Sequence, residues 1–74
     1  MGLERHVDSI LFNDPNVFRE DYGWNNGLYI YGSSIILRKI RAMKIMKALN
    51  ESGEFGKTSF DEETRKIEFE PVEE

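Results

Sequence analysis

The chain has 74 residues and a formal net charge of −4, with 39% hydrophobic and 12% aromatic residues. This apolar content is sufficient for a folded core and excludes a disordered chain. Because cysteine is absent, a disulfide framework and a thiolate zinc site are excluded as well. At this length we expect one small domain, for which a single core leaves modest stability and for which a partner or a homodimer would add more.

The sequence contains no apolar run of roughly 18 residues, as a membrane-spanning helix requires. Charged residues interrupt its first twelve positions, unlike a signal peptide. We therefore expect a cytoplasmic protein that does not contact a membrane. The charges are unevenly placed, since residues 33–50 include five basic and no acidic side chains, whereas residues 51–74 include nine acidic and three basic ones. Separate positive and negative regions are expected on the folded chain.

The first predicted element is a short amphipathic helix over residues 3–12. Its apolar positions recur at three- and four-residue spacing: Leu3, Val7, Ile10 and Leu11. This is the pattern of one apolar helix face. A helix of this length is not stable alone and must dock on the rest of the chain. It should end at Asn13-Asp14-Pro15, because the residue before a proline is steered away from helical geometry.

Residues 17–32 predict an aromatic hairpin with Asn26-Gly27 as a two-residue type I′ turn. In this register the rings pair across the strands and share one face: Trp24 with Tyr29, and Tyr22 with Tyr31. Leu28 and Ile30 then lie on the opposite face. The alternative is a further helical turn from Asp14-Pro15 to Asp21, followed by a glycine-rich loop.

The central element is a helix over residues 33–50, with Ser33 or Ser34 as its N-cap and Gly53 after its end. A helical wheel places most apolar side chains on one half, which we expect to be buried: Ile35, Ile36, Ile40, Ala42, Met43, Met46 and Leu49. Basic residues form the outer half or its flanks: Arg38, Lys39, Arg41, Lys44 and Lys47. Leu37 and Ile45 fall on the basic side, where they predict a second packing surface.

Residues 55–70 predict a second hairpin with Asp61-Glu62-Glu63-Thr64 as its turn. The second strand alternates polar and apolar residues, as a half-exposed strand does, and points Ile67 and Phe69 inward beside Phe60. Residues 71–74 should form a frayed acidic tail.

The expected class is therefore α+β, in the order helix, hairpin, helix, hairpin. The two hairpins contribute to an antiparallel sheet, and both helices pack on one face of it.

No combination of residues predicts catalysis. His6 is the single histidine, and no serine occupies a Gly-x-Ser-x-Gly elbow that would present a nucleophile. The carboxylates of residues 61–63 lack the alternation of a calcium loop, and the glycines form no phosphate-binding motif. We expect a non-enzymatic protein without metal or cofactor, with His6 as a surface residue.

Two binding hypotheses follow. The first is a small acidic accessory protein, of regulatory or inhibitor type, that binds a protein partner or itself, because aromatic and exposed aliphatic side chains are typical of interfaces. Its expected contact residues are Tyr22, Trp24, Tyr29, Tyr31, Leu37 and Ile45.

The alternative is nucleic-acid binding by the basic helix face, with neighbouring aromatic rings stacking on unpaired bases. The residues for this role are Arg38, Lys39, Arg41, Lys44 and Lys47. The negative net charge opposes this alternative, because phosphate binding depends on a basic surface.

Overall fold

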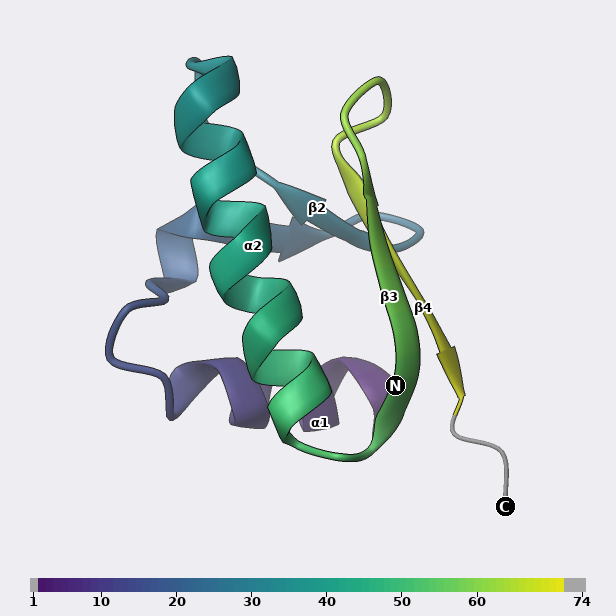
Figure 1. Cartoon of the computed structure of the whole chain (residues 1–74). Helices are drawn as coiled ribbons and strands as arrows, with labels where there is room; N and C mark the ends of the chain where they lie inside the picture. Colours follow the sequence, from purple (N-terminus) through teal and green to yellow (C-terminus); the bar gives the residue numbers. More distant parts are fainter. Residues whose placement is uncertain (1, 72–74) are drawn as a thin grey trace.

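The computed structural model describes residues 2–71, which form two α-helices and a four-stranded antiparallel sheet (Figure 1). In chain order the elements are α1 (Gly2–Phe12), the 3-10 helix η1 (Arg19–Asp21), β1 (Tyr22–Trp24), β2 (Leu28–Ile30), α2 (Ile35–Glu51), β3 (Phe55–Asp61) and β4 (Lys66–Pro71). The predicted α+β class and the order helix, hairpin, helix, hairpin are confirmed. Most of the expected tail, residues 72–74, lies outside the described residues.

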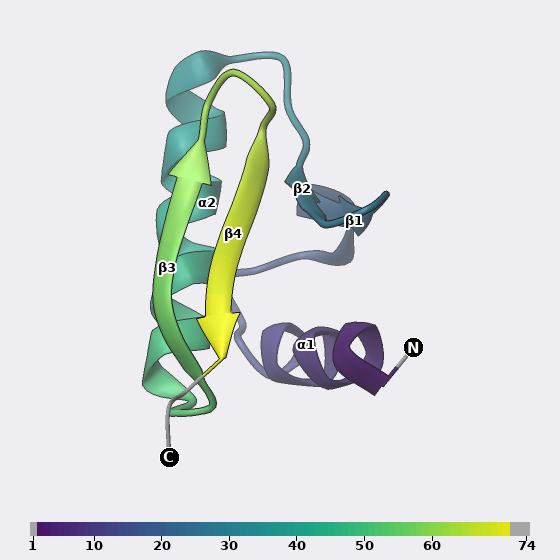
Figure 2. The same ribbon diagram turned by 90° about the vertical axis from the view of Figure 1, so that its right-hand side faces the viewer.

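The sheet has the strand order β1-β2-β4-β3, so the two hairpins are joined through β2 and β4. Leu28 pairs with Ile67 and Tyr29 with Lys66 across this junction. Figure 2 shows the β3–β4 hairpin running lengthwise beside α2, with the β1–β2 hairpin turned steeply away from it. The helix α2 packs against β2 and β3, and α1 packs against α2.

One core joins all of these layers. Its buried members come from both helices, all four strands and the segment after α1: Val7, Leu11, Val17, Tyr22, Leu28, Ile30, Ala42, Ile45, Leu49, Phe55 and Ile67. Phe60 and Phe69 pack against it while remaining partly exposed. The prediction that Ile67 and Phe69 point inward beside Phe60 is confirmed.

Local hydrogen bonds end α1 and turn the chain toward β1. The Asn16 amide donates to the Asp14 carboxylate over 2.9 Å, and the Val17 amide donates to the Asp14 carbonyl over 3.1 Å. An aspartate before proline therefore makes the turn through its own side chain. The alternative helical turn from Asp14-Pro15 to Asp21 does not form. Only Arg19–Asp21 are helical, as the short 3-10 helix η1, and a hairpin follows it instead of an irregular loop.

The first hairpin forms with a register one residue away from the predicted one. Its loop has three residues, Asn25–Gly27, in which Asn26 takes a φ of 64° and the Asn25 amide donates to the Gly27 carbonyl over 3.1 Å. The observed pairs are Tyr22 with Ile30, Gly23 with Tyr29, and Trp24 with Leu28. A shift of one residue moves side chains to the other sheet face. The predicted pairing of aromatic rings was therefore wrong.

Both ends of α2 follow the predicted signals. Ser34 is the N-cap, with its hydroxyl oxygen accepting from the Leu37 amide over 3.4 Å. After Glu51 the chain reaches Gly53 at a φ of 73°, a left-handed conformation that glycine adopts without a steric cost. At the tip of the second hairpin, the Asp61 carboxylate accepts from the Glu63 amide over 3.0 Å, as the turn sequence predicted.

Candidate partner-binding site

The buried side of α2 matches the helical-wheel prediction only in part: Ala42 and Leu49 are buried as expected, and Met46 packs against the core. Its inward stripe consists of Arg38, Ala42, Ile45 and Leu49. Ile45, expected on an outer packing surface, has 0% exposure and belongs to the core. The physical reason is that Arg38 finds polar partners inside the fold, so a basic residue occupies one position of the buried stripe.

Arg38 is 6% exposed and its guanidinium binds two distant parts of the chain. One terminal nitrogen donates to the Gly32 carbonyl over 2.8 Å. The other donates to Oε1 of Glu62, at the tip of the second hairpin, over 2.8 Å, and Nε donates to the same oxygen over 3.2 Å. Because its charge is paired and each of its three guanidinium nitrogens donates within the fold, Arg38 is not available to a nucleic acid.

Arg41 is also used internally. Its Nε lies 3.0 Å from the Asp21 carboxylate, and one terminal nitrogen donates to the Tyr31 carbonyl over 3.2 Å. These contacts bind α2 to η1 and to the segment that leads into α2. Of the predicted nucleic-acid residues, Arg38 and Arg41 are thus placed as structural ion-pair partners.

The opposite side of α2 exposes large apolar side chains that the sequence assigned to the core. We call Ile36, Ile40 and Met43 the outer seam; Ile36 is 71% exposed, Met43 is 66% exposed and Ile40 is 43% exposed. Leu37 is exposed beside this seam, as predicted for it, and so is Ile35. In Figures 1 and 2 no other element of the described chain covers this side of α2.

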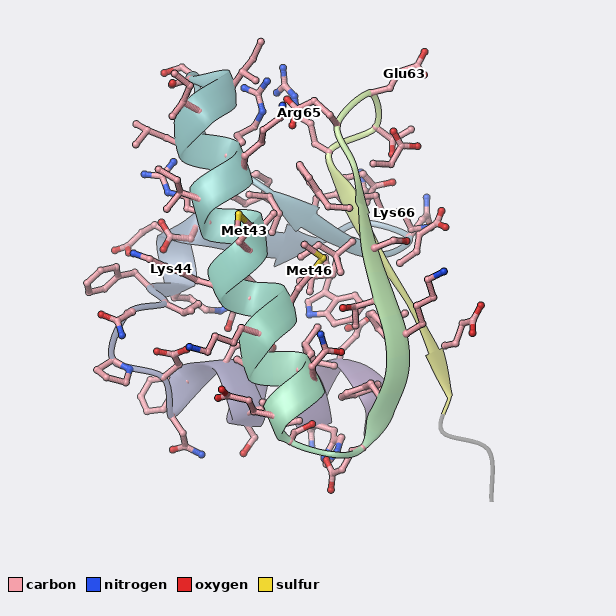
Figure 3. All side chains as sticks on the ribbon, viewed as in Figure 1. Met43, Lys44, Met46, Glu63, Arg65 and Lys66 are labelled. Carbon is pink, nitrogen blue, oxygen red and sulfur yellow. The ribbon has the colours of Figure 1, made fainter. Side chains whose placement is uncertain are left out.

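Lysines border the outer seam on both sides. Lys39 and Lys44 are exposed, and within residues 2–71 neither has a carboxylate within ion-pair distance. Lys47 continues the line of the seam and lies 4.0 Å from Glu51. Figure 3 shows Met43 and Lys44 on the side of α2 away from the sheet, whereas Met46 points toward β3. The outer surface of α2 is therefore an apolar stripe with basic margins.

The predicted aromatic surface is divided between core and exterior. Tyr22 was expected to contact a partner, but it is buried with Leu28 and Ile30 and is not accessible to one. Trp24 is half-buried against the core, and its indole nitrogen donates to Asp8 over 3.4 Å. Tyr29 is half-buried, and Tyr31 is exposed with its ring packed over Gly23. The shifted register explains this division, because it turns Tyr22 and Trp24 toward the core.

Ionisable groups elsewhere have ordinary structural roles. His6 is exposed on α1 and pairs with Glu54. Burial raises the pKa of the Tyr22 phenol above its usual value of 10.0, and the nearby Asp8 charge acts in the same direction. Within the described residues, no three His, Asp or Glu side chains gather as a metal site would require.

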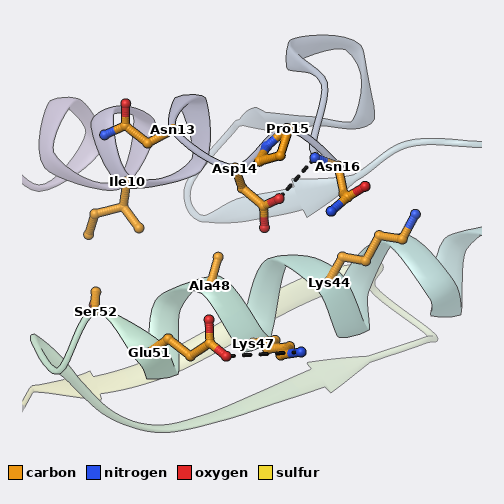
Figure 4. Close-up of a pocket in the computed structure, with 10 residues that line it drawn as sticks. All are labelled: Ile10, Asn13, Asp14, Pro15, Asn16, Lys44, Lys47, Ala48, Glu51 and Ser52. Carbon is orange, nitrogen blue, oxygen red and sulfur yellow. Dashed lines mark hydrogen bonds and ion pairs between the residues drawn. The ribbon is translucent and has the colours of Figure 1, made fainter.

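An open depression of about 840 Å³ lies between the end of α1 and the second half of α2 (Figure 4). Its wall is mixed: Ile10, Asn13, Asp14, Pro15, Asn16, Lys44, Lys47, Ala48, Glu51 and Ser52. The Lys47 ammonium faces Glu51, and Asp14 accepts from Asn16. Lys44, which also lines the depression, has no carboxylate within ion-pair distance among residues 2–71.

The sequence of α2 contains a second apolar stripe, which is missed when the helix is assumed to have one apolar face. Two stripes run along α2 at the same spacing of four, three and four residues: positions 36, 40, 43 and 47, and positions 38, 42, 45 and 49. Each stripe has three apolar residues and one basic residue. A helix with two such stripes has two faces able to pack, and the fold uses one of them.

None of the helices in the described part of the chain combines the length and apolar content needed to cross a bilayer. Comparisons with protein-family models, with curated proteins and with solved structures found no match to this chain.

Proposed function

We propose that this chain is a non-enzymatic protein-interaction module that binds a protein partner through the outer seam of α2. The observation that carries the proposal is that Ile36, Ile40 and Met43 form a continuous exposed stripe on a helix whose other side is fully packed. Leu37 is exposed beside the stripe, and contiguous exposed apolar side chains rimmed by polar residues are typical of interaction sites.

The energy available to a partner is substantial. Fully burying an aliphatic side chain contributes about 1.5–3 kcal/mol. The three side chains of the outer seam already bury part of their surface within α2, so covering the remainder would contribute roughly 3–5 kcal/mol before the cost of association. Apolar side chains that the partner buries in turn, and polar contacts at the margin, must add to this amount to exceed the cost of association.

Nucleic-acid binding remains the rival proposal, and the geometry weakens its support. Arg38 and Arg41 are engaged in ion pairs with Glu62 and Asp21. The free lysines border an apolar stripe, whereas phosphate-binding faces present several bases together. A surface of this composition suits a protein better than a phosphate backbone.

The test is a peptide-display selection against the wild-type chain, followed by rebinding to two variants. Met43→Glu places a carboxylate in the outer seam and should abolish binding of most selected peptides. Phe12→Ser is the matched control, because Phe12 is 82% exposed but lies on α1; binding should be unchanged. Peptides that bind Met43→Glu as well as wild type would contradict the proposal. Short DNA and RNA strands, titrated at low and high salt, test the rival, which predicts saturable binding that Lys39→Glu and Lys44→Glu abolish.

A further inference from the structure

The outer seam has the spacing of a coiled-coil position set. Ile36, Ile40, Met43 and Lys47 are separated by four, three and four residues, the alternation of d and a positions in a heptad. A helix that packs along this stripe inserts its own apolar side chains between them as knobs into holes. The stripe from residue 36 to residue 47 spans about 17 Å, so a partner of three helical turns covers it.

The same heptad assignment gives Lys39 and Lys44 a defined role. Lys39 precedes an a position and Lys44 follows a d position, which makes them the g and e residues on either side of the seam. Charges at e and g positions determine which helix is accepted and which is rejected. Both charges here are positive, and among residues 2–71 neither is paired with a carboxylate.

We infer that the partner is an acidic amphipathic helix from a different protein. It would present apolar residues at alternating three- and four-residue spacing, with aspartate or glutamate at the positions that face Lys39 and Lys44. This inference rests on the proposed function and specifies it, because it adds the chemistry of the partner to the site.

A second copy of the chain does not fit the seam. In a parallel pair the g residue of one helix faces the e residue five positions later on the other, so Lys39 meets Lys44 twice. In an antiparallel pair that overlaps the seam, Lys39 faces Met46 or Lys39 of the other copy. Lys44 faces Leu37 or Lys44 of the other copy, again without a carboxylate. No acidic residue occurs between Ile36 and Lys47. Self-association through this seam therefore brings repulsion, or at best no attraction, to its margins.

The net charge of the chain excludes long-range attraction as the cause of a preference for an acidic helix. The whole chain has a net charge of −4, and long-range attraction therefore does not favour an acidic ligand. A preference for an acidic helix must arise from the two flanking lysines at close range. Substituting these lysines should then be sufficient to reverse the preference.

The experiment uses two synthetic helical peptides with an identical leucine seam, one with glutamate and one with lysine at all e and g positions. Binding of each labelled peptide to the intact chain is followed by fluorescence anisotropy at low and high salt. We expect the glutamate peptide to bind at least about tenfold more tightly, a ratio that corresponds to roughly 1.4 kcal/mol, and to weaken as salt rises. The double variant Lys39→Glu/Lys44→Glu should reverse the preference.

A matched control has the same change in net charge at another place. Arg5→Glu/Lys57→Glu alters two exposed residues on α1 and β3, and it should keep the preference for the glutamate peptide. Loss of the preference in this control as well would overturn the inference, because the effect would then follow net charge and not the margins of the seam.

The remaining outcomes separate the inference from the proposed function. If both peptides bind equally and Met43→Glu abolishes both, the acidic partner is wrong and the interaction module stands. A dimer in sedimentation velocity that Met43→Glu dissociates would assign the seam to a second copy and overturn the inference. Seam-dependent binding to phosphatidylserine vesicles, with neither peptide bound, would assign it to a membrane and overturn both. Binding of neither peptide, with no association sensitive to Met43→Glu, would overturn the proposed function itself.

Discussion

Replacing Arg38 by alanine tests whether this basic side chain of α2 is internal. The substitution removes three hydrogen bonds, two to Glu62 and one to the Gly32 carbonyl. It also leaves the Glu62 carboxylate without its counter-charge. If Arg38 were an exposed residue, as the helical wheel indicated, the same substitution would change stability by less than about 0.5 kcal/mol.

The magnitude follows from the burial of the two partners. Breaking a fully buried ion pair costs about 3–5 kcal/mol. Arg38 is nearly buried, but the Glu62 side chain is 32% exposed and can regain water when its partner is removed. We therefore expect Arg38→Ala to lower the free energy of unfolding by about 2–3 kcal/mol.

Urea unfolding measures this loss, with Trp24 as the fluorescent reporter because it packs against the core. With a denaturant slope of about 1 kcal/mol per molar urea, the midpoint should fall by about 2–3 M. Lys39→Ala, the exposed neighbour, is the control and should shift the midpoint by less than about 0.5 M. If Arg38→Ala does not fold, Arg38→Met keeps the packed methylene stem and reports the polar contribution alone. An Arg38→Ala midpoint equal to that of Lys39→Ala would refute the reasoning.

Two further predictions concern the core. Ile45→Ala should cost about 2–4 kcal/mol, because the fully buried side chain leaves a cavity. Met43→Ala on the exposed side should cost less than about 1 kcal/mol; thermal unfolding of both variants compares the two faces, and equal losses would contradict the assignment. Burial holds the pKa of Tyr22 above 10.0, so the unfolded chain loses this proton first. Stability is therefore complete below about pH 10 and declines as pH rises toward the folded pKa. Tyr22→Phe should remove that decline in urea unfolding at about pH 8 and pH 11; an unchanged decline would exclude Tyr22 as its source.

Most of the secondary structure could be predicted because its signals are local. Ser34 caps α2 through an amide three residues later, and Asp61 accepts from an amide two residues later. Such contacts depend on a few neighbouring residues and not on the rest of the fold. The order of elements follows from them, and it is the order that the structure has.

The register of the first hairpin could not be predicted from its turn sequence alone. Asn26-Gly27 is compatible with a two-residue turn, but Asn25 joins the loop. Of the two asparagines in this loop, Asn26 has the left-handed φ. In the observed register Tyr22 and Trp24 share the inward face with Leu28 and Ile30. Burial of these side chains in a common core outweighs the turn preference.

The buried face of α2 could not be chosen from the helix alone. Its two stripes have the same spacing and a similar apolar content. The choice depends on Gly32 and Glu62, because these residues supply the acceptors that allow Arg38 to be buried. Their proximity is a property of the assembled fold, and it is invisible to a helical wheel.

The β2–β4 junction has a consequence for how the chain folds. Each hairpin pairs residues that are close in sequence, whereas Leu28 reaches Ile67 only after all of α2 and β3 have been traversed. The chain loses conformational entropy when this long loop closes. The register pairs that form at the junction, Leu28 with Ile67 and Tyr29 with Lys66, are few and offset little of that loss. We infer that the two hairpins and α2 organise early and that the joining of β2 to β4 sets the folding rate.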